Sequence, residues 1–270
     1  MRIAVQRAAM SALIGALAVI LAGPASAQTA PTRPAAPSTP AQDEAIRRGA
    51  ALHDQGKFAE AVAVYEGVLT DNPDNTLALY ELAYSLLEQK EYARALETAT
   101  RGTRYRSGQL AMFYDLMGSA HDLMGEPQKA VETYTRGIAA VPDSATLYYN
   151  RGVTELESLK DPVAARRSFE QALIIEPLQP SAHLMLGQLF QSNGYPVPGF
   201  FAFSMALLLE PGGPQALRAY GFMRTILRGG LSNDPNAPAN QMVQAGGMRP
   251  RTGAAKTDEG DYAALEALLA

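Results

Sequence analysis

The sequence predicts an all-α protein, built as an α-solenoid of five helix pairs that ends in a single capping helix. Three observations in the 270 residues favour this fold. Apolar residues recur at helical spacing, a pattern of small and aromatic residues returns at a fixed period, and glycine or proline separates the segments. The period is decisive, because a constant step is typical of a repeated helical unit.

The first segment, residues 1–27, has the pattern of a signal peptide. Arg2 and Arg7 precede a short apolar run, which leads to the small-residue cleavage pattern Ala25-Ser26-Ala27. The run is shorter than the ~20 residues that a transmembrane helix needs, so we expect cleavage and not a retained anchor. The mature chain is predicted to begin at Gln28 and to be periplasmic or secreted.

A proline-rich linker follows at residues 28–41, where prolines recur every third position among Ala, Thr and Ser. Such a composition predicts an extended, solvated spacer. The helical array is predicted to occupy residues 42–228.

Residues 56–73, GKFAEAVAVYEGVLTDNP, show one helix of this array. Four apolar residues share one side of a 3.6-residue helix: Ala61, Val64, Tyr65 and Val68. Gly56 is suited to end the preceding helix in a left-handed conformation, and Pro73 cannot continue this one.

The pattern of this helix returns in five copies. In each, a small residue is followed four positions later by a residue that is aromatic in all copies but one, and the steps between copies are 34, 35, 35 and 34 residues. The pairs are Ala61/Tyr65, Ala95/Ala99, Ala130/Tyr134, Ala165/Phe169 and Gly199/Phe203. A second small residue marks the first half of each unit: Gly49, Ala83, Gly118, Gly152 and Gly187. A small residue there allows two antiparallel helices to approach closely.

From Gln42 to about Pro211, this arrangement resembles the tetratricopeptide repeat family, whose pattern is W-x2-L-G-x2-Y, then A-x3-F, then P. Leu186-Gly187 matches most clearly, whereas tryptophan is absent from the chain. The resemblance implies a right-handed superhelix, lined on its inner surface by the first helix of each pair.

The C-terminal part divides into three predicted segments. Residues 214–228 form one more helix, expected to cap the last pair with a polar outer face. Residues 229–260 have the composition of a disordered linker. Residues 261–270, DYAALEALLA, form a short amphipathic helix with Leu265, Leu268 and Leu269 on one side. This tail either docks on the array or remains a frayed end or a motif for another protein.

Composition excludes several kinds of site. The chain has 23 Lys plus Arg and 27 Asp plus Glu, and loss of Arg2 and Arg7 leaves a net charge of minus six, which argues against a nucleic-acid partner. Without cysteine there are no disulfides or thiolate sites. The three histidines fall in different units at no ligand spacing, so they are predicted to pack. No catalytic residue, metal ligand or cofactor is predicted.

The inner surface is the predicted partner site, and its residues follow from the register of the resembled family. The resemblance implies that positions two, five, nine and twelve of each first helix face the inner surface. The predicted groove residues at these positions are Tyr80, Tyr84, Met112, Asp115, Ser119, Asp122, Tyr149, Val153, Leu184 and Gln188. Tyr80, Tyr84 and Tyr149 lie outside the family's buried positions, so they either contact a partner or pack on neighbouring units. Two aspartates would make the middle of the groove acidic and attract Lys or Arg of a partner.

The predicted function is therefore that of a non-catalytic periplasmic adaptor, which binds a protein or peptide of the cell envelope in its groove. The alternative is a protein of cell-envelope metabolism that binds a glycan or small molecule on the same tyrosine-rich surface. No integral membrane anchor is expected after signal cleavage, and the oligomeric state stays open.

Overall fold

The computed structural model describes residues 33–231 of the chain. The predicted signal peptide and the predicted tail at 261–270 lie outside this range, as does nearly all of the predicted linker at 229–260. Within residues 33–231 the chain forms eleven helices in consecutive packed pairs, with one helix left over at the end. The predicted all-α solenoid of five pairs is confirmed.

The five pairs follow one another along the chain with short turns. They are α2 (Pro40–Asp54) with α3 (Phe58–Asp71), α4 (Thr76–Glu88) with α5 (Tyr92–Gly102), α6 (Leu110–Leu123) with α7 (Pro127–Ala140), α8 (Ala145–Glu157) with α9 (Pro162–Ile175), and α10 (Pro180–Ser192) with α11 (Pro196–Leu209). The last helix, α12 (Pro214–Leu231), continues beyond its predicted end at Arg228.

The turn inside each pair uses a left-handed residue at the same point of the repeat. Gly56 has φ +74°, as its position predicts, and Gly125 and Gly194 have φ +75° and +80°. In the second and fourth pairs, Lys90 and Lys160 adopt φ 63° and 57° instead. The period of the sequence is therefore also a period of the backbone.

The core consists of four clusters of buried residues that follow one another along the array. A ring from the second helix lies against the small residue of the first, as Tyr65 lies against Gly49 and Phe169 against Gly152. In the second unit, where Ala99 replaces the ring, Phe113 of α6 packs over Gly102 at the end of α5.

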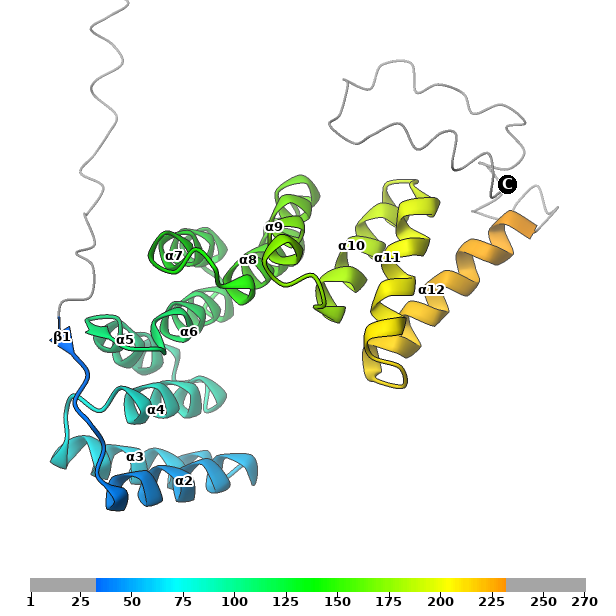
Figure 1. Cartoon of the computed structure of the whole chain (residues 1–270). Helices are drawn as coiled ribbons and strands as arrows, with labels where there is room; N and C mark the ends of the chain where they lie inside the picture. The colour runs from blue at the N-terminus through cyan, green and yellow to red at the C-terminus, as the bar shows by residue number, and fades with distance from the viewer. Residues whose placement is uncertain (1–32, 232–270) are drawn as a thin grey trace, which may run out of the picture.

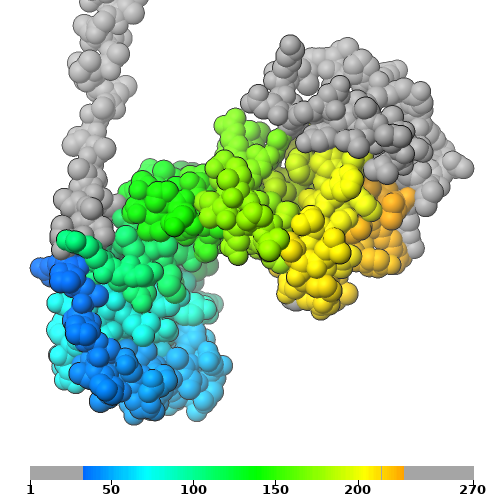
Figure 2. Space-filling model, in the orientation of Figure 1, coloured from blue at the N-terminus to red at the C-terminus, as the bar shows by residue number. Residues whose placement is uncertain are grey.

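The array is bent into an arc, and Figure 2 shows the hollow that this leaves between its first and last units. Neighbouring first helices contact each other, α2 with α4, α4 with α6, and α6 with α8. They lie on the inner side of the arc (Figure 1). Among the helices between Arg33 and Leu231, none combines the length and apolarity that a membrane crossing needs.

The described end of the proline-rich segment is extended, as predicted, and it docks on the array. β1 (Arg33–Pro34) pairs in parallel with β2 (Tyr105–Arg106), and Ala36 donates its N–H to the Asp74 carbonyl at 3.2 Å. The side chain of Asn72 donates to the Pro37 carbonyl at 3.2 Å. This stretch, here called the N-terminal strap, therefore connects the turn before α4 to the turn between α5 and α6.

The outer face of α12 differs from the prediction. α12 covers the last pair, with Ala219 fully buried beside Phe203 of α11. On its other side, however, Leu217, Tyr220 and Leu227 are 73%, 56% and 52% exposed. Within residues 33–231, α12 therefore covers the last pair as predicted, but its outer face carries exposed apolar residues and is not wholly polar.

Candidate binding surface

Five rings form a continuous series of contacts across the first three units, here called the aromatic ladder. The ladder consists of Phe58, His53, Tyr84, Tyr80 and Phe113, from α3, α2, α4 and α6. His53 stacks on Tyr84 with ring centroids 4.6 Å apart, and Tyr84 stacks on Tyr80 at 6.3 Å. The ladder therefore links three units through side chains alone.

Within the ladder, His53 is fixed by a hydrogen bond and Tyr84 is partly exposed. The His53 Nδ1 atom lies 2.9 Å from the hydroxyl oxygen of Ser85, a fully buried residue, which fixes the ring beside Tyr84. Tyr80 is half-buried, and burial raises its pKa to about 12. Tyr84 is 36% exposed. Both tyrosines pack on neighbouring units, and Tyr84 also offers surface, so contact with a partner stays a prediction.

Two further apolar side chains on the same helices remain exposed. Leu77 of α4 is 37% exposed and Met112 of α6 is 41% exposed. Both occupy the second position of their helices in the repeat register, a predicted inner position. Together with Tyr84 they present an apolar surface on the inner side of units two and three.

The two predicted groove aspartates instead connect α6 to α8. Asp115 accepts a hydrogen bond from the Asn150 amide at 2.5 Å, and Asp122 accepts one from the Thr154 hydroxyl at 3.0 Å. Burial raises the pKa of Asp115 to about 6. The two aspartates of the predicted acidic centre therefore form hydrogen bonds between the third and fourth units.

Of the other predicted groove residues, most take part in packing. The Ser119 hydroxyl lies 3.2 Å from that of Tyr134, and Tyr149 and Val153 pack on the cluster around Phe169. Leu184 is only 1% exposed, so it contributes no surface to a groove. It is buried against the last pair and α12. Gln188 stays partly exposed on α10.

Sequence reasoning missed three residues of the ladder, His53, Phe58 and Phe113. His53 was missed because all three histidines were predicted only to pack. His53 occupies the twelfth position of the first unit, which is an inner position, so the repeat register could have predicted it on this surface. The other two make local contacts: His121 Nδ1 lies 2.9 Å from a Glu126 carboxylate oxygen, and His183 Nε2 lies 2.9 Å from the Pro177 carbonyl. Across residues 33–231 no three acidic or histidine side chains gather as metal ligands would.

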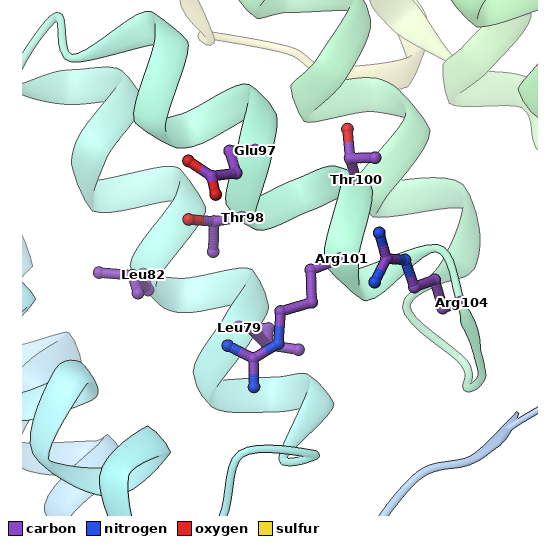
Figure 3. Close-up of a pocket in the computed structure, with 7 residues that line it drawn as sticks. All are labelled: Leu79, Leu82, Glu97, Thr98, Thr100, Arg101 and Arg104. Carbon is purple, nitrogen blue, oxygen red and sulfur yellow. The ribbon is translucent and has the colours of Figure 1, made fainter.

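A cavity of about 310 Å³ lies apart from the ladder, between α4 and α5 (Figure 3). Leu79 and Leu82 come from α4, while Glu97, Thr98, Thr100, Arg101 and Arg104 come from α5 and its end. The Arg101 guanidinium donates to the Pro73 carbonyl, which ties this side of α5 to the first unit. No ring of the ladder lines this cavity.

Two sequence models, both described as tetratricopeptide repeat, match residues 52–120 and 116–180. Among curated proteins, the Hsp70-Hsp90 organising protein of Plasmodium falciparum (isolate 3D7) is similar, with 27% identity over 161 residues. This match covers 57% of the present chain and 27% of that protein. The chain thus spans about a quarter of the length of this relative.

Solved structures share the fold. A thermophilic TPR protein of Thermus thermophilus superimposes with a TM-score of 0.56 and 22% identity, over 68% of this chain and 99% of that one. The pilF protein of Pseudomonas aeruginosa gives a TM-score of 0.56 and 17% identity, over 77% of this chain and 98% of that one. At these identities the likeness concerns the helical architecture alone.

Proposed function

We propose that this chain, which matches tetratricopeptide repeat models over residues 52–180, is a non-catalytic adaptor that binds a polypeptide segment on the inner face of its first three units. Proteins of this family mediate protein–protein interactions. For this chain the question is which surface does so.

The aromatic ladder is the observation that carries the proposal. A core ring needs no exposed edge, yet Tyr84 keeps 36% of its surface exposed while it stacks between His53 and Tyr80. Tyrosine offers a large contact area at small entropic cost, together with a hydroxyl that forms hydrogen bonds. Because the ring is already held on both sides, a partner would bind to it without ordering it first.

The shape of the surface favours a polypeptide over a small molecule. Leu77, Tyr84 and Met112 are partly exposed and are spread over two helices and two units. Such a spread suits several side chains along one segment, as when an apolar helix face lies in a groove. Small ligands, in contrast, usually bind in enclosed pockets.

The charges beside the ladder favour a partner with Lys or Arg next to its apolar residues. Asp54, at the end of α2, is exposed, and Glu81 lies half-buried next to Tyr80. Burial raises the pKa of Glu81, while nearby His53 lowers it and nearby Asp54 raises it. A cation from the partner would relieve the cost of this buried carboxylate.

We place the adaptor in the periplasm, because residues 1–27 have the composition of a cleaved signal peptide. Cell fractionation followed by N-terminal sequencing tests this part separately. A protein that begins at Gln28 in the periplasmic extract supports the location, whereas an intact Met1 in washed membranes contradicts it.

The binding proposal is tested with envelope proteins captured by crosslinking in native cells. Tyr84→Ala/Met112→Ala should lose the partners that the unaltered chain recovers. The matched control, Val163→Ala/Ile174→Ala, removes side chains that are 62% and 69% exposed on α9 and should retain them. Equal recovery by both variants would reject the ladder as the binding surface. A dose-dependent rise in melting temperature with cell-wall fragments would favour the glycan alternative instead.

A further inference from the structure

α12 occupies the place of the first helix of a sixth unit. A step of 34 residues takes Ala182 of α10 to Ala216 and Gly187 to Gly221. Ala182 is fully buried and Ala216 is 2% exposed, so α10 and α12 bury the same side of the helix against the array. Phe222 of α12 stacks on Phe203 of α11 with ring centroids 4.9 Å apart. The repeat thus continues past the fifth pair and stops halfway through a unit.

The side of α12 that would receive a second helix is uncovered within the described residues. Leu186 of α10 is 6% exposed, whereas its counterpart Tyr220 is 56% exposed. A Cβ added to Gly187 would lie 2.6 Å from the Phe203 ring, but one added to Gly221 would meet nothing within 4 Å. Leu217, at the position of the first aromatic slot, is 73% exposed. α12 has the surface of a first helix without its partner.

We propose that residues 261–270 of the same chain supply the second helix of this sixth unit. The segment DYAALEALLA places Leu265, Leu268 and Leu269 on one side, which suits an apolar face. Ala264 and Leu268 stand four residues apart, as do Ala165 and Phe169 of the fourth unit. Leu268 would lie over Gly221 as Phe203 lies over Gly187.

Chain length permits this contact. From Leu231 to Asp261 a linker of about thirty residues has a root-mean-square span of roughly 30 Å. The eighteen residues of α12 are roughly 27 Å long, at about 1.5 Å per residue, so the segment reaches the whole helix. Tethering to the same chain also gives an effective concentration near the millimolar range, which favours this segment over a second copy.

Charge complementarity supports the same occupant. Arg224 is exposed on α12. The segment carries Asp261 and Glu266 and has no Lys or Arg. Ten residues are too few to hold a helix alone in water, because nucleation is costly, so the segment needs such a surface.

Cysteine crosslinking tests the proposal without interference, because the chain has no cysteine of its own. In the fifth unit a Cβ added to Gly199 would lie 3.2 Å from the Gly187 carbonyl oxygen, so these two backbones are adjacent. The corresponding pair is Gly221→Cys with Ala264→Cys. The control pair combines Arg218→Cys with Ala264→Cys, since position 218 is turned toward the inner side in the repeat register.

The first pair should form an intramolecular disulfide on mild oxidation of the full-length chain, and the control pair should not. Adding Leu268→Asp should abolish the crosslink. Deletion of residues 261–270 should raise amide exchange along α12 and lower the melting temperature by about 2 to 4 °C. Equal crosslinking of both pairs, or unchanged exchange after the deletion, would overturn the proposal. A disulfide-linked dimer as the main product would also overturn it and assign the face to a second copy.

Discussion

Phe203 of α11 lies so close to Gly187 of α10 that a methyl group on the glycine would come within 2.6 Å of the ring. The same relationship joins Tyr65 to Gly49 at 2.5 Å and Phe169 to Gly152 at 2.8 Å. In each of these units the aromatic residue of the second helix therefore packs directly against the small residue of the first helix. This contact sets the distance between the helices of a pair and explains why both residues recur at one period.

Gly187→Ala should therefore destabilise the array by about 1 to 3 kcal/mol, because the added methyl group has no space under the Phe203 ring. Urea denaturation followed by circular dichroism measures the change. Gly67→Ala is the matched control, since nothing lies within 4 Å of a Cβ at this exposed position of α3. It should stabilise the protein by about 0.5 to 1 kcal/mol through helix propensity. Equal effects of both substitutions would contradict this account of the pair contact.

The number and type of helices could be predicted because the period reflects a local contact within each unit. Ala61/Tyr65 and its counterparts record that contact directly, so a single sequence suffices. Leu184 was misplaced because the register fixes only the side of α10 on which it lies. Its burial depends on how closely α11 and α12 pack against it, and spacing along one helix does not report this distance.

The role of Asp115 was beyond prediction for a related reason. Its inner position was predicted, but its partner Asn150 lies on the next unit, and two residues 35 positions apart reveal no hydrogen bond in sequence. The docking of residues 33–39 is similar, because a proline-rich composition predicts an extended backbone without showing what it contacts. Sequence therefore predicted the unit well and the contacts between units poorly.

Lys90 adopts a left-handed backbone at the point where Gly56 does so one unit earlier. Because this conformation costs a residue with a Cβ about 1 kcal/mol, Lys90→Gly should stabilise the protein by about that amount. The reciprocal change, Gly56→Ala, should destabilise it similarly. Thermal denaturation of the two variants compares them. Destabilisation by Lys90→Gly would mean that the lysine side chain contributes more than its backbone costs.

Asn75 joins a helix cap to the N-terminal strap. Its side-chain oxygen accepts the Ala78 N–H at 2.9 Å, and its amide donates to the Ser38 hydroxyl at 3.0 Å. Asn75→Ala loses both interactions and should cost about 1 to 2 kcal/mol. Asn75→Asp keeps the cap and loses only the donor, so its loss should be smaller. Amide exchange at Ala36 should rise in both variants, and unchanged exchange there would show that Asn75 does not hold the strap.

The buried carboxyl of Asp115 gives the stability of the protein a definite pH dependence. Its pKa is about 6 in the folded chain, raised by burial, against about 4 in an unfolded chain. Between these values the folded state holds a proton that the unfolded state has lost, so stability falls as pH rises from about 4 to about 6. Tyr80 of α4 and Tyr134 of α7 face the same region, and burial raises the pKa of both.

Asp115→Asn removes the cost of ionising this carboxyl while it keeps an oxygen that accepts from Asn150. The variant should be more stable than the unaltered protein by about 2 to 3 kcal/mol at pH 7.5 and equally stable at pH 4, because a shift of one pKa unit corresponds to about 1.4 kcal/mol. Urea denaturation at several pH values measures the difference. The control is Asp143→Asn, at an exposed position in the turn before α8. Its stability should differ little from that of the unaltered protein at either pH. The stability difference between Asp115→Asn and the unaltered protein should depend on pH, because Asp115 titrates in this range. A difference that stays the same at all pH values would contradict the raised pKa of Asp115.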